Sequence, residues 1–143
     1  MGFYHYTQAA LPRILKPRAY KQTSNHKPDG LWLSVDGEWE DWCKKEQFHL
    51  ESLTKKHTVT FQGLAILWIT TPEALERFTE QYGEDSWNIR WDNVTKDYDG
   101  IVISPYQWRK RCAEGTRWYY SWDCASACLW RWKPGQVVVD EAA

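Results

Sequence analysis

The stretch from Trp118 to Trp132, WYYSWDCASACLWRW, is the part of the chain on which the fold prediction rests most. It holds four tryptophans, two tyrosines, one aspartate and two cysteines, and seven further tryptophans lie upstream. An ordinary core does not need so many large aromatic rings in one segment. The composition around Asp123 therefore predicts either a densely packed aromatic core or an aromatic-walled binding pocket.

Side-chain alternation gives this stretch two faces if it forms one or two strands. One face would carry Tyr119, Ser121 and Asp123, and the other Trp118, Tyr120, Trp122 and Cys124. We expect the tryptophan face to build the core and the Asp123 face to carry function. Partial burial raises the pKa of a carboxyl group and suits acid or base chemistry. The alternative is that the Asp123 carboxylate caps a turn into Ala125 and Ser126.

Length and composition limit the class of protein. A chain of 143 residues is long enough for one domain with a sizeable core and too short for two ordinary ones. Hydrophobic residues make up 43% and charged residues 26%, which is typical of soluble globular proteins. The net charge of -1 gives no global electrostatic reason for a nucleic-acid or membrane partner. Without a secretory signal or an apolar run of about 20 residues, we expect a cytoplasmic protein.

The four cysteines, Cys43, Cys112, Cys124 and Cys128, are expected to stay reduced in that compartment. The spacing Cys124-x-x-x-Cys128 suggests zinc, but the other candidate ligands, among them His49 and His57, are isolated in the sequence. Buried reduced cysteines are the commoner outcome. We therefore expect no metal.

The first third of the chain predicts alternating strands and helices. Residues 3–7 have strand propensity, and Thr7 would cap a short helix over residues 8–16, with Pro12 near its first turn. Residues 17–30 indicate an exposed loop, which could serve as a lid. A second strand over residues 31–35 and a helix within residues 36–47 follow.

The rest of the chain continues this mixed pattern. Two strands are expected between residues 49 and 70, and the apolar run 64–69 predicts a buried central strand. Thr71-Pro72 begins a helix that ends at Gly83. We expect a short strand or helical turn over 87–94, a buried strand over 101–104 and a basic helix or turn over 105–112. An edge strand over 137–139 and a frayed tail over 140–143 complete this pattern. The predicted class is α+β, one domain with a mostly antiparallel core.

Basic residues interleave with the aromatic ones near the opening stretch. They are Arg109, Lys110, Arg111, Arg117 and Arg131. Cations beside stacking rings suit nucleotides and single-stranded nucleic acids, although a basic run is usually only a solvated face. The common nucleotide-loop, zinc-protease and esterase motifs do not occur.

Three short motifs resemble the ADP-ribosyltransferase superfamily. They are Phe3-Tyr4-His5-Tyr6-Thr7, the later Gly30-Leu31-Trp32-Leu33-Ser34, and Tyr98-Asp99-Gly100-Ile101. The resemblance covers the first third of the chain and one later strand. It implies a split, mostly antiparallel β core with a NAD cleft between the two halves.

The resemblance also implies roles for individual residues. His5 would bind a ribose hydroxyl, the Tyr6 backbone the nicotinamide amide, and Thr7 the adenosine side. Trp32 or Ser34 would take the second-strand position, and Trp39 or Trp42 would stack on the nicotinamide. Tyr106 is also expected to bind the cofactor. The expected catalytic residues are His5, Ser34 and Asp123.

The chain departs from the family pattern in two places. Tyr6 stands where that family commonly has glycine, and the strand over 101–104 offers no acid. Asp123 is the best substitute for the missing glutamate, because ADP-ribose transfer needs a carboxylate beside an oxocarbenium-like transition state. Without it the fold would bind and not catalyse.

The PYQW and WYYSWDCASACLW segments are also similar to small phage and bacterial proteins. That similarity implies a phage–host conflict setting, inside a bacterial host, and a host protein target. The leading hypothesis is a NAD-binding or nucleotide-binding ADP-ribosyltransferase-like protein that transfers or hydrolyses ADP-ribose. The alternative is a non-enzymatic module that captures a nucleotide, a nucleic acid or a partner protein through its Trp/Arg-rich surface; a nucleic acid is the less favoured ligand.

Overall fold

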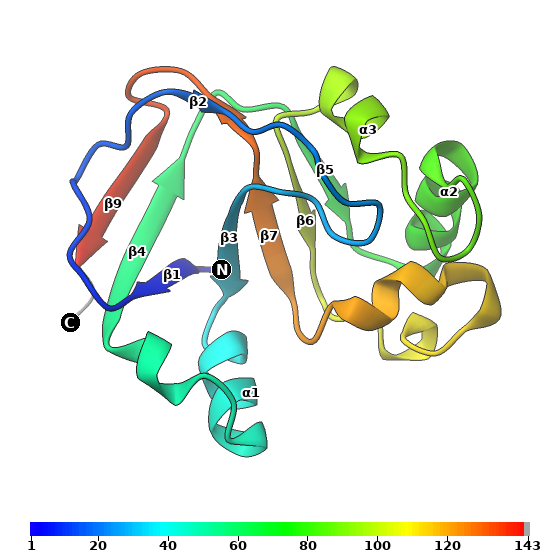
Figure 1. The fold of residues 1–143 in the computed structure, drawn as a ribbon, viewed down its shortest axis with the longest axis horizontal. Coiled ribbons are helices and arrows are strands. Elements are labelled where there is room, and N and C mark those ends of the chain that lie inside the picture. Colours follow the sequence, from blue (N-terminus) through cyan, green and yellow to red (C-terminus); the bar gives the residue numbers. More distant parts are fainter. Residues whose placement is uncertain (142–143) are drawn as a thin grey trace.

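A seven-stranded sheet organises the computed structural model, which describes residues 1–141. The strand order is β5-β6-β7-β3-β1-β4-β9 (Figure 1). The strands are β1 (Phe3–Thr7), β3 (Leu31–Val35), β4 (Lys55–Phe61), β5 (Ile66–Ile69), β6 (Gly100–Ile103), β7 (Ser126–Leu129) and β9 (Val137–Glu141). β5 and β6 pair in parallel and the other pairs are antiparallel. The predicted α+β class with a mostly antiparallel sheet is confirmed.

Three α-helices and three short 3-10 helices surround the sheet. They are α1 (Glu38–Glu46), α2 (Pro72–Tyr82), α3 (Trp91–Asp97), η1 (Leu50–Leu53), η2 (Trp108–Lys110) and η3 (Glu114–Ser121). The predicted start of α2 is confirmed, because the Thr71 hydroxyl accepts a hydrogen bond from the Ala74 amide at 3.1 Å and Pro72 follows the cap. At α1 a cap comes from outside the helix: the Ser34 hydroxyl accepts from the Trp39 amide at 3.0 Å. Within residues 1–141, no helix is long and apolar enough to cross a membrane.

The sheet opens between β1 and β3. These strands share only the register pairs Phe3↔Val35 and Tyr4↔Ser34, whereas β1 pairs with β4 from Tyr4 to Thr7. Beyond Tyr4, the link across the gap is a side chain, since the His5 ring bonds the Trp32 carbonyl. The opening places polar side chains of β1 and β3 beside an incompletely paired part of the sheet.

The predicted helix over residues 8–16 is wrong. The Thr7 hydroxyl donates to the Ala9 carbonyl in a local turn, and the chain then runs extended around β9 (Figure 1). Ile14 forms a bridge with Val138, and the Val139 amide donates to the Arg13 carbonyl at 2.7 Å. Covering the edge of β9 satisfies backbone groups that an exposed edge strand leaves unpaired.

The segment over residues 17–30 is an exposed loop in part. The two-residue strand β2 (Arg18–Ala19) pairs with β8 (Arg131–Trp132). Further along, the Asn25 carbonyl accepts from the Ile89 amide at 2.8 Å. The loop is therefore tied to the body of the protein at both places.

The predicted central position of residues 64–69 is also wrong. β5 lies at the edge of the sheet and pairs only with β6, and Trp68 is 48% exposed. Its apolar run serves one buried face, on which Ile69 is 1% exposed. Residues 87–94 contribute the start of α3, and the predicted edge strand at the C-terminal end is confirmed as β9. Residues 140 and 141 of the predicted tail belong to β9, and residues 142–143 lie outside the described part.

The opening aromatic stretch begins as a helix and ends as strands. Trp118–Ser121 belong to η3, Trp122 and Asp123 form an irregular connection, the chain bends at Cys124 and Ala125, and β7 starts at Ser126. The predicted alternation is therefore wrong: Trp118 and Tyr119 are both buried, and Tyr120 is exposed. Buried positions spaced by three or four residues fit a helical face, which brings Trp118 and Trp122 together with ring centroids 6.2 Å apart.

The tryptophan-rich core is hydrogen-bonded as well as packed. Phe78, Trp91 and Trp118 lie within 6 Å of one another by ring centroid. Buried indoles find acceptors across the fold: Trp118 donates to the Thr79 hydroxyl at 2.9 Å and Trp130 to the Tyr98 carbonyl at 2.7 Å. The Trp122 indole N–H, which has no partner within residues 1–141, departs from this pattern.

Candidate functional site

A cavity of about 270 Å³ lies at the opening between β1 and β3. Its wall comes from β1, β3, the start of α1, η1, the segment before β7 with the first residue of β7, and the loop before β3. The lining residues are Tyr4, His5, Tyr6, Lys27, Trp32, Leu33, Ser34, Trp39, Ser52, Trp122, Asp123, Cys124 and Ser126. Ligand sites commonly have about 300 to 1,000 Å³, so this cavity suits one ring and sugar of a dinucleotide rather than a whole one.

His5 is fixed as a neutral hydrogen-bond acceptor on the cavity wall. Its Nδ1 lies 2.7 Å from the Trp32 carbonyl, and because a carbonyl only accepts, Nδ1 carries the proton. Burial lowers the pKa of His5, and the neighbouring His57 lowers it further, while the carbonyl bond opposes both. In the neutral ring Nε2 has a free lone pair, which suits a ligand hydroxyl.

Within residues 1–141, Asp123 is the one cavity-lining residue with a carboxyl group. Burial raises its pKa, Lys27 and Arg111 pull the pKa down, and Glu46 pushes it up. The net shift is upward, so desolvation outweighs the two cations. The Arg111 guanidinium lies 4.0 Å from the Asp123 carboxylate, which is a long ion pair. Asp123 therefore keeps a carboxyl group accessible in a partly dry site.

A buried tyrosine holds the segment that carries Asp123. The Tyr106 hydroxyl donates to the Trp122 carbonyl and accepts from Arg111 Nη1 at 3.0 Å. Tyr106 also stacks on Tyr119, with centroids 5.1 Å apart. The same arginine thus contacts this segment through Tyr106 and lies near the Asp123 carboxylate.

Two lining residues have buried donors with unmet hydrogen-bonding capacity. Over residues 1–141, the buried side-chain polar atoms that lack a partner are the Tyr6 hydroxyl and the Trp122 indole nitrogen. Burial is the main cause that raises the pKa of Tyr6, to about 12, and Glu40 adds to it, so the hydroxyl stays protonated. An unmet buried donor costs about 1–3 kcal/mol. Both residues with such an unpaired donor line the same cavity.

Ser34 lines the cavity but its hydroxyl is already engaged. It donates to the Asp36 carbonyl at 3.1 Å and accepts from the Trp39 amide. This arrangement shapes the junction of β3 and α1 and leaves no proton for chemistry. Trp39 presents one ring face to its neighbour Trp42, at 5.3 Å and 9° between planes, and itself lines the cavity.

The structure brings most of the predicted site residues together and leaves three apart. His5, Tyr6, Trp32, Ser34, Trp39 and Asp123 line the cavity, whereas Thr7, Trp42 and Tyr106 do not. The Thr7 hydroxyl instead accepts from His57 Nε2 at 2.8 Å. Trp42 supports Trp39, and Tyr106 supports the segment with Asp123.

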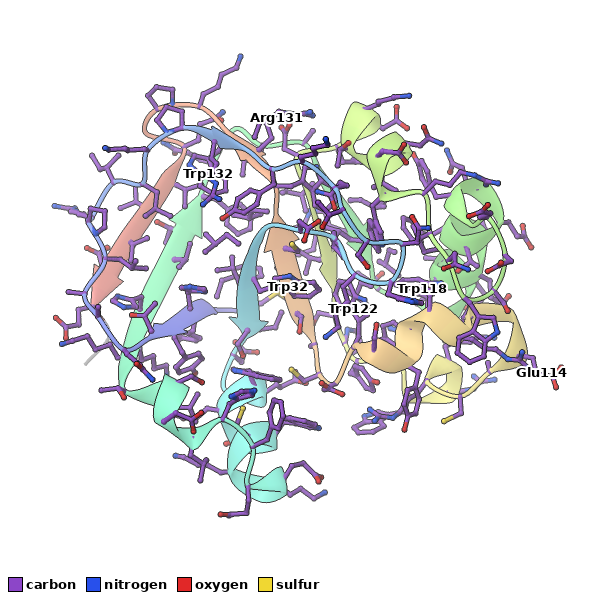
Figure 2. All side chains as sticks on the ribbon, viewed as in Figure 1. Trp32, Glu114, Trp118, Trp122, Arg131 and Trp132 are labelled. Atoms are coloured by element: carbon purple, nitrogen blue, oxygen red, sulfur yellow. The ribbon has the colours of Figure 1, made fainter. Side chains whose placement is uncertain are left out.

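Seven lining residues were not predicted as site residues: Tyr4, Lys27, Leu33, Ser52, Trp122, Cys124 and Ser126. Lys27 belongs to the segment that the sequence predicts to be a loop or lid, which is a signal for it. Trp122 is 1% exposed and belongs to the core as predicted, and it also lines the cavity. Figure 2 shows Trp122 beside Trp32 near the middle of the molecule, and their ring centroids are 4.8 Å apart.

The interleaved basic residues do not gather at this cavity. Arg131 lies near the other end of the aromatic stretch (Figure 2), where it donates to the Asp99 carboxylate at 2.8 Å. Lys110 pairs with Glu76, and Arg117 lies 5.2 Å above the Trp87 ring. Within the described residues, no group of three or more metal-ligating side chains occurs.

No protein-family model, curated protein or solved structure matches this chain.

Proposed function

We propose that the protein is ADP-ribosyltransferase-like and binds the nicotinamide and ribose part of NAD in the cavity between β1 and β3. The observation that carries the proposal is the convergence of His5 and Asp123, 118 positions apart in the sequence, on one aromatic-walled cavity. Tyr6 and Trp122, whose buried donors lack a partner within residues 1–141, both belong to the wall of this cavity. The resemblance of the YHYT and GLWLS motifs supplies the ligand class.

Each polar group would then have a role set by its chemistry. His5 Nε2 accepts from a ribose hydroxyl, and the free face of Trp39 receives the nicotinamide ring. The Asp123 carboxylate faces the ribose, where positive charge develops as the bond from the ribose to nicotinamide breaks and its electron pair leaves with nicotinamide. Water or a target side chain then attacks the same carbon and loses a proton.

The test is release of nicotinamide from NAD, with and without a bacterial lysate as the source of acceptors. Asp123→Asn should lower the rate by at least about a hundredfold and weaken NAD binding by a much smaller factor, because the charge that it removes matters most in the transition state. His5→Ala should weaken NAD binding by about tenfold, because it removes one hydrogen-bond acceptor.

Asp140→Asn, at an exposed carboxylate in β9, is the matched control and should behave as the unmodified protein. Equal rates in the unmodified protein, Asp123→Asn and His5→Ala would reject the assignment of the site.

A second candidate function is a non-enzymatic module that captures a partner, for instance a host defence protein in a phage setting. The observation that favours it is an exposed aromatic surface next to the cavity. Trp108 is 70% exposed and Tyr120 57% exposed, and Arg111 lies 4.9 Å over the Tyr120 ring. A protein that binds NAD without releasing nicotinamide, and whose tryptophan emission responds to a host protein or an oligonucleotide, would support this function.

A further inference from the structure

Lys27 is the one lysine or arginine among the cavity-lining residues within the described chain. The other basic lining residue, His5, has a lowered pKa and is neutral near pH 7. An anionic group of a ligand in this cavity therefore meets a single permanent cation. The opposite charge in the wall is Asp123.

The Lys27 ammonium acts on Asp123 through its charge, which lowers the pKa of that carboxyl group. Among residues 1–141 it nevertheless makes no ion pair within 4.0 Å, and it lies 5.6 Å from the centroid of the Trp32 ring. Other cations of the region are engaged, since Arg131 bonds Asp99 and Lys110 pairs with Glu76. A cation resting over an aromatic face can move to a nearby anion at small cost.

The backbone on both sides of Lys27 is held in place. The Trp91 indole donates to the carbonyl of His26 at 3.2 Å, and the Trp32 indole donates to the carbonyl of Pro28 at 3.2 Å. Pro28 is buried while the Lys27 side chain is exposed. The segment thus fixes where the lysine starts and leaves its ammonium free to reach the cavity.

We infer that the Lys27 ammonium contacts the phosphate next to the ribose of the bound ligand and so selects a nicotinamide nucleotide over the corresponding nucleoside. The inference rests on the proposed function and names a residue that determines its specificity. The charges are complementary: the nicotinamide ring bound to ribose is a cation and suits the Asp123 side, and the phosphate is an anion and suits the Lys27 side.

The test uses two ligands that differ by one phosphate, nicotinamide mononucleotide and nicotinamide riboside. Their affinities are measured by quenching of tryptophan emission in the unmodified protein, in Lys27→Met, and in Lys21→Met. Lys21 lies in the same segment, is exposed and does not line the cavity, so it is the matched control. Methionine is an unbranched side chain only one heavy atom shorter than lysine, and it removes the charge.

The mononucleotide should bind about five- to tenfold more tightly than the riboside to the unmodified protein and to Lys21→Met. In Lys27→Met the two affinities should become equal, with riboside binding unchanged or tighter because a repelling cation is gone. The preference should also shrink as salt rises.

Four results would overturn the inference. If the preference survives in Lys27→Met, another group binds the phosphate. If both ligands weaken equally in that variant, the lysine acts on the shape of the cavity. If the unmodified protein cleaves NAD and binds the mononucleotide and the riboside equally well, the proposed function stands and the phosphate contact does not exist. If NAD and both smaller ligands fail to bind, the proposed function and the inference about Lys27 are both rejected.

Discussion

Removing the Tyr106 hydroxyl is expected to destabilise the protein and disturb the cavity together. Tyr106 is 7% exposed, and its hydroxyl donates to the Trp122 carbonyl and accepts from Arg111. Tyr106→Phe keeps the ring and its stacking on Tyr119 but leaves a buried carbonyl without its donor. Such a loss costs about 1–3 kcal/mol, so we expect about 2 kcal/mol less stability. For a chain of this size that corresponds to a Tm lower by about 4–8 °C.

Denaturant unfolding followed by tryptophan emission measures this change, with an unchanged m value showing that the unfolding transition is the same. Tyr20→Phe is the control, because the Tyr20 hydroxyl makes no hydrogen bond within residues 1–141, and it should change stability by less than about 0.5 kcal/mol. Tyr106→Phe should also weaken quenching by NAD, since the segment with Asp123 loses its anchor. A variant as stable as the unmodified protein would refute the role given to this hydroxyl.

Three further results are expected. Trp118→Ala should lower the free energy of unfolding by about 3–5 kcal/mol, because it empties the centre of the aromatic core, and a loss below about 1 kcal/mol in denaturant would contradict that packing. Burial raises the pKa of Asp123 in the folded state, so its ionised form opposes folding. Asp123→Asn should therefore have a higher Tm than the unmodified protein at pH 7, and thermal melts should show this gain vanish as the pH falls below the ordinary pKa of aspartate. A gain in Tm that persists at such low pH would reject the desolvation argument. In native protein, mass spectrometry after brief iodoacetamide treatment should find alkylation at the exposed Cys112 and not at the three buried cysteines, and early modification of a buried thiol would show that the core opens readily.

The sequence predicted the elements whose local signals agree with their packing. β1 and β3 have strand propensity and lie side by side in the sheet, and α2 has both a capping residue and an apolar stripe. The cavity followed from these elements, because His5 and Trp32 lie on two predicted strands that separate after a short pairing. Resemblance to known motifs supplied the ligand class, which geometry alone does not.

The remaining elements depend on contacts between distant parts of the chain, which override the local propensity and cannot be predicted from a local sequence pattern. The chain after Thr7 has helical propensity, yet it covers the edge of β9, where pairing at Ile14 satisfies backbone groups. In the aromatic stretch, residues up to Ser121 form a 3-10 helix and those from Ser126 form strands, and no single period describes both. Lys27 reaches the cavity only because distant indoles, including that of Trp91, hold its loop.

The most direct test of the central claim is to follow the eleven indole N–H resonances of the ¹⁵N-labelled protein by NMR as NAD is added, assigning them with single Trp→Phe variants. A NAD site between β1 and β3 predicts shifts at Trp32, Trp39 and Trp122, largest at Trp122 because its indole N–H has no partner within residues 1–141. The indoles of Trp68 and Trp108, which lie outside the cavity wall, should keep their positions. Shifts confined to those two, or no shift at any indole at millimolar NAD, would contradict the claim.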